Sequence, residues 1–104
     1  MTELVLAFDI EHSGTEVIAI GASVVDSNFK ELDRFLFGNY THGVTNFSER
    51  CWREFWSKNE GILKIIKYTG NQDLPKKLRE KEMITQFQNF RSKWDGCCSS
   101  NSIH

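Results

Sequence analysis

Two short runs of β-prone residues lie on either side of a turn signal near the start of the chain. The first run covers residues 4–8 and the second covers residues 17–25, with Ser13 and Gly14 between them. The second run is too short and too rich in β-branched residues for a free-standing helix. We therefore expect two buried strands joined by a tight turn, with Gly21 marking a bulge or a close approach by a neighbouring segment.

A third strand is expected after the polar turn at residues 26–28. Residues 32–40 place Phe35 and Phe37 on one face of an extended segment, because strand side chains alternate between the two faces of a sheet. The three segments together predict an α/β fold that begins with a three-stranded antiparallel meander and continues with helices.

Helical patterns replace the strand patterns in the second half of the chain. Ser48 is a good N-cap, and Phe47 and Trp52 fall where a hydrophobic staple would join them. The first helix is expected from Ser48 onward, with an apolar face that comprises Trp52, Phe55, Trp56, Leu63 and Ile66. Residues 67–78 contain glycine, proline and several polar residues, which together predict a loop.

A second helix is predicted by apolar residues that recur in steps of four, three and four. These residues are Met83, Phe87, Phe90 and Trp94, and Asp95-Gly96 would end the helix. The three tryptophans of the chain could stack on nucleic-acid bases, but their helical spacing favours a place in the core.

The composition is typical of one globular domain. The chain has 104 residues, of which 39% are hydrophobic and 26% are charged, and no apolar run approaches the ~20 residues that a membrane span needs. We therefore expect an intracellular protein, cytoplasmic or nuclear, without membrane contact. The last eight residues, CCSSNSIH, lack any periodicity, so disorder is predicted for residues 97–104.

Charge is distributed unevenly along the chain. Residues 1–29 hold five acidic residues and no lysine or arginine, whereas residues 30–104 hold all 13 basic residues and nine acidic ones. An acidic start that attracts cations and a mildly basic remainder would suit a nucleic-acid enzyme. An ordinary solvated surface would have the same charge balance.

Asp9 and Glu11 are the residues with the clearest chemical meaning. They are two positions apart at the end of the first apolar run, so their side chains project from the same face of a strand. Two neighbouring carboxylates repel each other unless a cation lies between them, and Mg²⁺ favours oxygen ligands of this kind. A bare D-x-E also occurs at solvated strand ends that carry no function.

The segment FDIEHSGTEVIAIGASVVD resembles the first motif of the DEDD superfamily of 3′–5′ exonucleases, the DnaQ-like group. That motif is a strand ending in D-[IFLT]-E-T-T/S-G, followed by an I-x-x-I-G-A strand. The resemblance covers about the first forty residues of the chain. It implies a ribonuclease H-like α/β fold, with residues 1–96 as a partial exonuclease-like domain truncated before its last strands.

The resemblance also implies a function and a set of site residues. The family hydrolyses phosphodiester bonds at nucleic-acid 3′ ends with two Mg²⁺ or Mn²⁺ ions. Carried over by position, Asp9 would bridge both metals and Glu11 would bind one. His12 and Ser13 would contact the 3′-terminal nucleotide of single-stranded DNA or RNA. His12 replaces the usual Thr, and Ala19 stands where many members have Glu.

The later motifs of the family are absent from the sequence. No second-motif Asp is found, and neither His42 nor His104 is followed by the Asp of the third motif. Asp95 lies at the expected helix end rather than in a matching context. Because members of a catalytic unit act together, we expect the chain to be inactive alone. The apolar edge at residues 4–8 is expected to need a dimer or a partner chain to cover it.

Two other functions fit the same residues. The chain could be a non-catalytic nucleic-acid-binding or protein-interaction module on the same scaffold. It could also be a small structural α/β protein in which D-x-E is coincidental.

Overall fold

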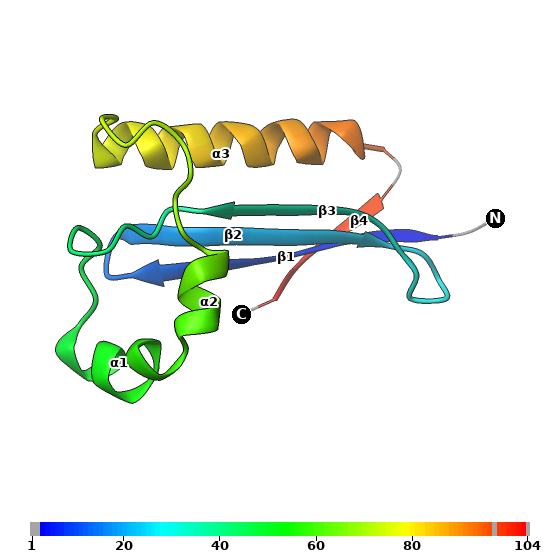
Figure 1. Ribbon diagram of the computed structural model, residues 1–104. Helices are drawn as coiled ribbons and strands as arrows, with labels where there is room; N and C mark the ends of the chain where they lie inside the picture. Colours follow the sequence, from blue (N-terminus) through cyan, green and yellow to red (C-terminus); the bar gives the residue numbers. More distant parts are fainter. Residues whose placement is uncertain (1–2, 97, 104) are drawn as a thin grey trace.

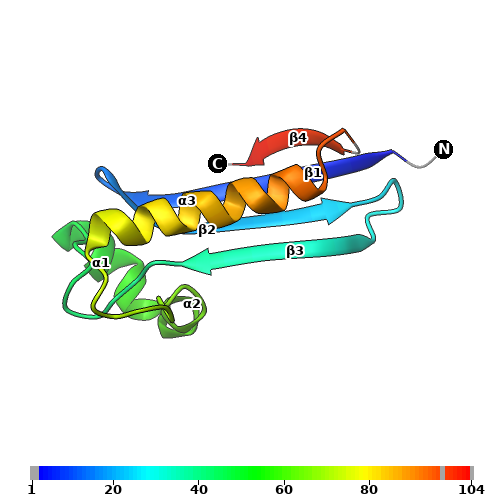
Figure 2. The same ribbon diagram turned by 90° about the horizontal axis from the view of Figure 1, so that it is seen from above.

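The computed structural model describes residues 3–96 and 98–103 (Figure 1). Four strands form one sheet in the order β3-β2-β1-β4. A long helix, α3, lies along one face of this sheet, and two short helices, α1 and α2, lie against the other face near one end (Figures 1 and 2). The chain is therefore an α/β protein, as the sequence predicts.

The antiparallel meander is confirmed. Strand β1 (Leu4–Ser13) pairs with β2 (Glu16–Val25), and β2 pairs with β3 (Glu31–Gly38). The β1–β2 turn contains Gly14 at φ 59°, a left-handed conformation that glycine adopts without steric cost.

The prediction for Gly21 was wrong in both its forms. The register shifts lie between Glu11 and His12 and between Val24 and Val25, not at Gly21. A Cβ added to Gly21 would meet only Leu36 Cδ1, at 3.9 Å, which is ordinary van der Waals contact. The bulges instead fall near the strand ends, where extra residues are tolerated without disturbing the central ladder.

Within residues 97–104, for which the sequence predicts disorder, the structure describes a strand at residues 98–103, and residues 97 and 104 lie outside the described residues. Cys98–Ile103 forms β4, which pairs in parallel with β1 from Leu4 to Asp9. The apolar pattern of the segment is poor, but backbone groups of a free sheet edge pair with any extended segment. The edge of β1 that was expected to need a partner chain is therefore covered by the chain itself.

Helix α3 (Lys76–Lys93) packs on the sheet through the apolar residues that the sequence pattern identified. Met83 is fully buried and Phe87 nearly so, and the Phe87 ring lies 5.2 Å from that of Phe8. This core, the α3 core, also includes Ile20 and Ala22, with Ile10, Val17, Phe35, Phe37 and Phe90 packed against it. The helix begins one turn earlier than predicted, after Pro75, whose fixed φ suits a helix start.

Asp33 on β3 binds the end of α3. Its Oδ2 accepts hydrogen bonds from Lys93 Nζ and Trp94 Nε1, both at 2.9 Å. The hydrogen bonds from Lys93 and Trp94 and from the Arg34 backbone N–H lower the pKa of Asp33 below its usual range. The helix ends at Lys93 with Trp94 as its C-cap, and Gly96 follows at φ 76°, as the Asp95-Gly96 signal predicted.

The single helix predicted after Ser48 is broken into three pieces. These are α1 (Glu49–Glu54), a 3₁₀ turn η1 (Trp56–Lys58) and α2 (Glu60–Ile65). Ser48 caps α1 as expected, with its Oγ accepting from Cys51 N at 3.2 Å. The Asn59 side chain donates to the Phe55 carbonyl at 2.6 Å, and such side-chain bonds to backbone compete with helical ones.

The short helices bury a second apolar cluster against the other face of the sheet. It comprises Ile18, Ala19, Tyr40, Trp56, Leu63 and Ile66, with Phe47 packed against it. The predicted staple is present, because the Phe47 and Trp52 rings stack with centroids 5.7 Å apart. Trp56 is core, as its spacing predicted, whereas Trp52 and Phe55 are 36% and 46% exposed.

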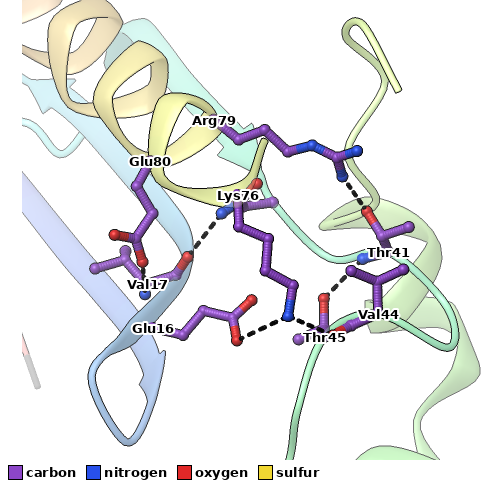
Figure 3. Close-up of polar contacts among 9 residues, drawn as sticks. Glu16, Val17, Thr41, Val44, Thr45, Lys76, Arg79 and Glu80 are labelled. Carbon is purple, nitrogen blue, oxygen red and sulfur yellow. Dashed lines mark hydrogen bonds and ion pairs between the residues drawn. The ribbon is translucent and has the colours of Figure 1, made fainter. Parts of the chain in front are cut away.

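Polar contacts join the start of α3 to the β1–β2 hairpin and to the loop after β3 (Figure 3). Glu80 Oε1 accepts from Val17 N at 2.7 Å, and Arg79 Nη1 donates to Thr41 Oγ1 at 2.8 Å. Lys76 Nζ donates to the Val44 carbonyl at 2.5 Å. These contacts hold the hairpin, the loop and the helix in a fixed relation. None of the helices in the described part of the chain has the length and apolar character needed to cross a lipid bilayer.

Candidate functional site

Asp9 and Glu11 lie on the same face of β1, as the alternation of strand residues predicts. Their neighbours Phe8 and Ile10 pack against the α3 core. The two carboxylates therefore lie on the opposite face of the sheet from α3. On β2, Asp9 pairs with Gly21 and Glu11 pairs with a second small residue, Ala19, which is buried in the second apolar cluster.

The two carboxyl groups interact with each other. The pKa of Glu11 is raised above its usual range, first by its partial burial and then by the negative charge of Asp9 and a hydrogen bond with the Asp9 side chain. The charge of His12 lowers the pKa of Glu11 by a smaller amount. A carboxyl group whose charged form is disfavoured by a neighbouring carboxylate gains from a cation placed between the two.

A β-bulge follows directly after the carboxylate pair. The register between β1 and β2 shifts between Glu11 and His12, after which His12 pairs with Val17 and Ser13 with Glu16. The His12 side chain is exposed and Ser13 is half-buried. Bulges often re-aim side chains next to functional sites, and this one separates Asp9 and Glu11 from the two residues predicted to contact a nucleotide.

Asp9 also lines a shallow, open groove of about 420 Å³ on the same face of the sheet. The floor of the groove contains Ala7 and Gly21, and Leu36, which is 49% exposed, forms part of its wall. Its far end holds an ion pair of 2.9 Å between Arg34 and Glu31. The groove gives the Asp9 carboxylate access to solvent and to a ligand.

The ligand set around Asp9 and Glu11 is incomplete. In residues 3–96 and 98–103, the structure brings together no group of three His, Cys, Asp or Glu side chains that could hold a metal ion. Asp95 lies in the turn after α3, and His42 lies in the loop after β3. The two carboxylates offer oxygen atoms of the kind that Mg²⁺ prefers, and no third such side chain joins them in the described part of the chain.

A second cavity, of about 260 Å³, was not predicted from the sequence. Its lining includes His42, Phe47 and Trp52, and the Tyr40 hydroxyl lies 3.2 Å from His42 Nδ1. These residues come from the loop after β3 and from α1, so no short sequence motif joins them. The only signal in the sequence was the Phe47–Trp52 spacing, which we interpreted as a helix staple.

Comparison with known proteins identifies no relative. No family model matches the chain, and neither a curated protein nor a solved structure is significantly similar to it. The functional interpretation therefore depends on the geometry of the site and on the motif in the sequence.

Replacing Glu11 by glutamine should stabilise the fold slightly at neutral pH, and because Glu11 is exposed, solvent screening keeps the gain small. Because its pKa is raised in the folded state, the folded protein binds the Glu11 proton more tightly than the unfolded chain does. The free energy of unfolding therefore falls as pH rises from ~4.3, the ordinary pKa of a glutamate, through the raised pKa of Glu11. Glutamine lacks this titration.

The measurement is urea unfolding of both proteins at pH 4 and pH 7. The stability of the Glu11→Gln protein relative to the parent should increase from pH 4 to pH 7. Glu3→Gln, which removes an exposed acid just before β1, controls for the change in net charge. An equal difference at both pH values would contradict the electrostatic coupling of the pair.

Proposed function

We propose that Asp9 and Glu11 are two carboxylate ligands of a divalent-metal site in a 3′–5′ exonuclease-like domain that acts on nucleic-acid 3′ ends. The observation that carries the proposal is the position of these two carboxylates on one face of β1, opposite α3, where the charge of Asp9 contributes to the raised pKa of Glu11. Mg²⁺ or Mn²⁺ bound there would polarise the phosphate of the substrate and activate the attacking water. His12 and Ser13, beyond the bulge, would meet the terminal nucleotide.

The arrangement of elements supports the same proposal. Three antiparallel strands, a fourth strand parallel to β1 and a long helix over one face are compatible with part of a ribonuclease H-like fold. In such a fold Asp9 belongs to a central strand, and here β1 has neighbours on both sides. A central strand holds its side chains more rigidly than an edge strand, which suits a metal ligand.

Mn²⁺ should bind at Asp9 and Glu11 and nowhere else with comparable affinity. The probe is Mn²⁺ alone, added to ¹⁵N-labelled protein, because the paramagnetic ion broadens the resonances of amides close to it. Broadening should centre on residues 9–12 and on their β2 neighbours at residues 19–21. Asp9→Asn and Glu11→Gln should each abolish it, whereas Glu3→Gln should not. Broadening that survives both substitutions would overturn the metal site.

Exonuclease activity is tested with a 5′-labelled single-stranded oligonucleotide and Mn²⁺, beside the Asp9→Ala protein. With two ligands from the described residues, we expect hydrolysis near background for the chain alone. A ladder of 3′-shortened products that disappears with Asp9→Ala would mean that further ligands are supplied from elsewhere, most simply by a second chain. Products that persist with Asp9→Ala would assign any activity to a contaminant.

One observation favours a second candidate, a non-catalytic module that binds single-stranded nucleic acid. Trp52 stacks on Phe47 at the rim of the 260 Å³ cavity, and His42 lies beside them. Exposed aromatic rings of this kind stack on nucleic-acid bases. Binding that is independent of Mn²⁺, falls steeply with salt and is lost with Trp52→Ala would favour this candidate over the exonuclease.

A further inference from the structure

Two grooves of the molecule share one side chain, Leu36. The larger, of about 420 Å³, is the groove that Asp9 lines. The smaller, of about 230 Å³, lies beside β3, which is the outermost strand on that side of the sheet. Leu36 is half-exposed and lines both grooves. A ligand that is longer than the larger groove can therefore continue over Leu36 into the smaller one.

Asp9, Gly21 and Leu36 form one row across the sheet. Asp9 pairs with Gly21, and Gly21 pairs with Leu36. Paired residues share a face of the sheet, so the Leu36 side chain lies on the same face as the Asp9 carboxylate. A Cβ added to Gly21 would meet Leu36 Cδ1 at 3.9 Å. Because Gly21 has no side chain, the row is open from Asp9 to Leu36, over two strand spacings or about 10 Å.

The smaller groove is basic. Lys64 and Lys67 line it beside the exposed side chain of Ile65. Neither lysine forms an ion pair with another residue that the structure describes. Glu82 also lines this groove, and its Oε2 accepts from the Tyr68 hydroxyl at 3.1 Å. The lysines outnumber this acid, so the groove attracts anions, whereas the Asp9 end of the larger groove attracts cations.

The fold holds the two lysines at fixed positions on the Asp9 side of the sheet. Helix α2, which contains Lys64, lies against the face opposite α3 (Figures 1 and 2). Lys67 forms an isolated parallel bridge with Tyr40, directly after β3. In this bridge, Tyr40 N donates to the Ile66 carbonyl at 3.0 Å and Tyr68 N donates to the Tyr40 carbonyl at 2.8 Å. Groups on rigid elements position a ligand more precisely than groups on loops.

We propose that Leu36, Lys64 and Lys67 bind the part of a single nucleic-acid strand that precedes its 3′-terminal nucleotide. The inference rests on the proposed function, because the 3′ end at Asp9 and Glu11 sets the direction of the strand. Phosphates bind the two ammonium groups, and a sugar or base packs on Leu36 after the strand has crossed Gly21. The three residues position the substrate and take no part in the chemistry.

The lysine contacts are tested by fluorescence anisotropy of a labelled single-stranded oligothymidylate with Mg²⁺. Lys64→Gln combined with Lys67→Gln should weaken binding about tenfold at about 0.1 M salt. The slope of log K against log salt should fall by about 1.4, because each phosphate contact of a single strand contributes about 0.7. The matched control, Lys77→Gln with Lys81→Gln, removes two exposed lysines from α3 and should change affinity less than about twofold. Equal weakening in both double variants would overturn the proposal.

The direction of the strand is tested with a nitroxide at either end of a short oligothymidylate bound to ¹⁵N-labelled protein. The 3′ label should broaden amides at residues 19–21, and the 5′ label should broaden amides at residues 64–67. The reverse pattern, or broadening of the same residues by both labels, would contradict the proposed path.

The effect of Mg²⁺ on affinity separates this inference from the metal site. Mg²⁺ should strengthen binding by the parent, because a cation between the carboxylates removes their repulsion of the strand. Asp9→Asn should remove that gain, whereas the Lys64 and Lys67 double variant should keep it. Affinity that is indifferent to Mg²⁺, with the lysine dependence and the broadening pattern as expected, would contradict the metal site and support the strand path.

Discussion

Replacing Arg79 by alanine should lower the free energy of unfolding by about 3 kcal/mol or more. Arg79 is only 6% exposed although it lies on an 18-residue helix with many solvated positions. The substitution removes a buried cation together with the hydrogen bonds that satisfy it. It also takes the donor away from three part-buried oxygens, and an unpaired polar group costs up to about 1–3 kcal/mol when it is buried.

The contacts of Arg79 explain why the effect should be large. Its Nε donates to the Leu74 carbonyl at 2.7 Å and its Nη2 to the Gln72 carbonyl at 2.5 Å. Its Nη1 reaches Thr41 (Figure 3), and its guanidinium lies 4.6 Å from the centre of the Tyr68 ring. One side chain thus joins the loop before α3, the loop after β3 and the helix itself.

Urea unfolding of the Arg79→Ala protein measures the loss. Lys77→Ala, two residues earlier on the exposed side of the same helix, should change stability by less than about 0.5 kcal/mol. Arg79→Lys should also be destabilised, because lysine keeps the charge but not the planar fork that reaches three acceptors. A loss below about 1 kcal/mol for Arg79→Ala would mean that water replaces the guanidinium easily.

Helix α3 shows which buried residues a sequence pattern can identify and which it cannot. The spacing of Met83 and Phe87 identified the buried face because apolar periodicity reports burial directly. Arg79 lies on that same face, one turn before Met83. Because it is charged, a pattern based on apolar residues predicts it to be exposed. The acceptors that make its burial tolerable come from Thr41, Gln72 and Leu74, and no local signal links those positions.

Strand β4 and the broken first helix were missed for related reasons. A segment such as Ser-Ser-Asn-Ser becomes a strand only because the edge of β1 is available, which is a tertiary effect. At the break at residues 55–59, the Asn59 side chain bonds the Phe55 carbonyl. Competition between side-chain and backbone hydrogen bonds changes local structure without altering the apolar pattern.

The candidate site was predictable in part. The two-residue spacing of Asp9 and Glu11 fixed their common face, because strand alternation is a geometric property of the backbone. The sequence could not identify their small neighbours on β2, Gly21 and Ala19, because register between strands is set by turns and packing. The register shift after Glu11, at which Ile18 is the extra residue on β2, was likewise not predicted.

Replacing Gly38 by alanine should destabilise the fold by about 3 kcal/mol, at the upper end of the cost of overpacking. Gly38 ends β3 where the chain after α2 crosses the sheet. A Cβ at this position would fall on the backbone of Ile66, against its carbonyl carbon and oxygen. Because Tyr40 N donates to the Ile66 carbonyl at 3.0 Å and Tyr68 N donates to the Tyr40 carbonyl at 2.8 Å, the two segments cannot separate without losing these bonds.

Gly61 provides a matched control for this prediction. It lies in α2, and a Cβ added there would meet nothing within 4 Å. Gly61→Ala should therefore stabilise the protein by about 0.5 kcal/mol through helix propensity. Replacing glycine by alanine should thus change stability in opposite directions at these two sites in the same part of the fold. Urea unfolding of both variants would test this, and similar stability for Gly38→Ala and the parent would mean that the segment at residues 66–68 can move away from β3 at little cost.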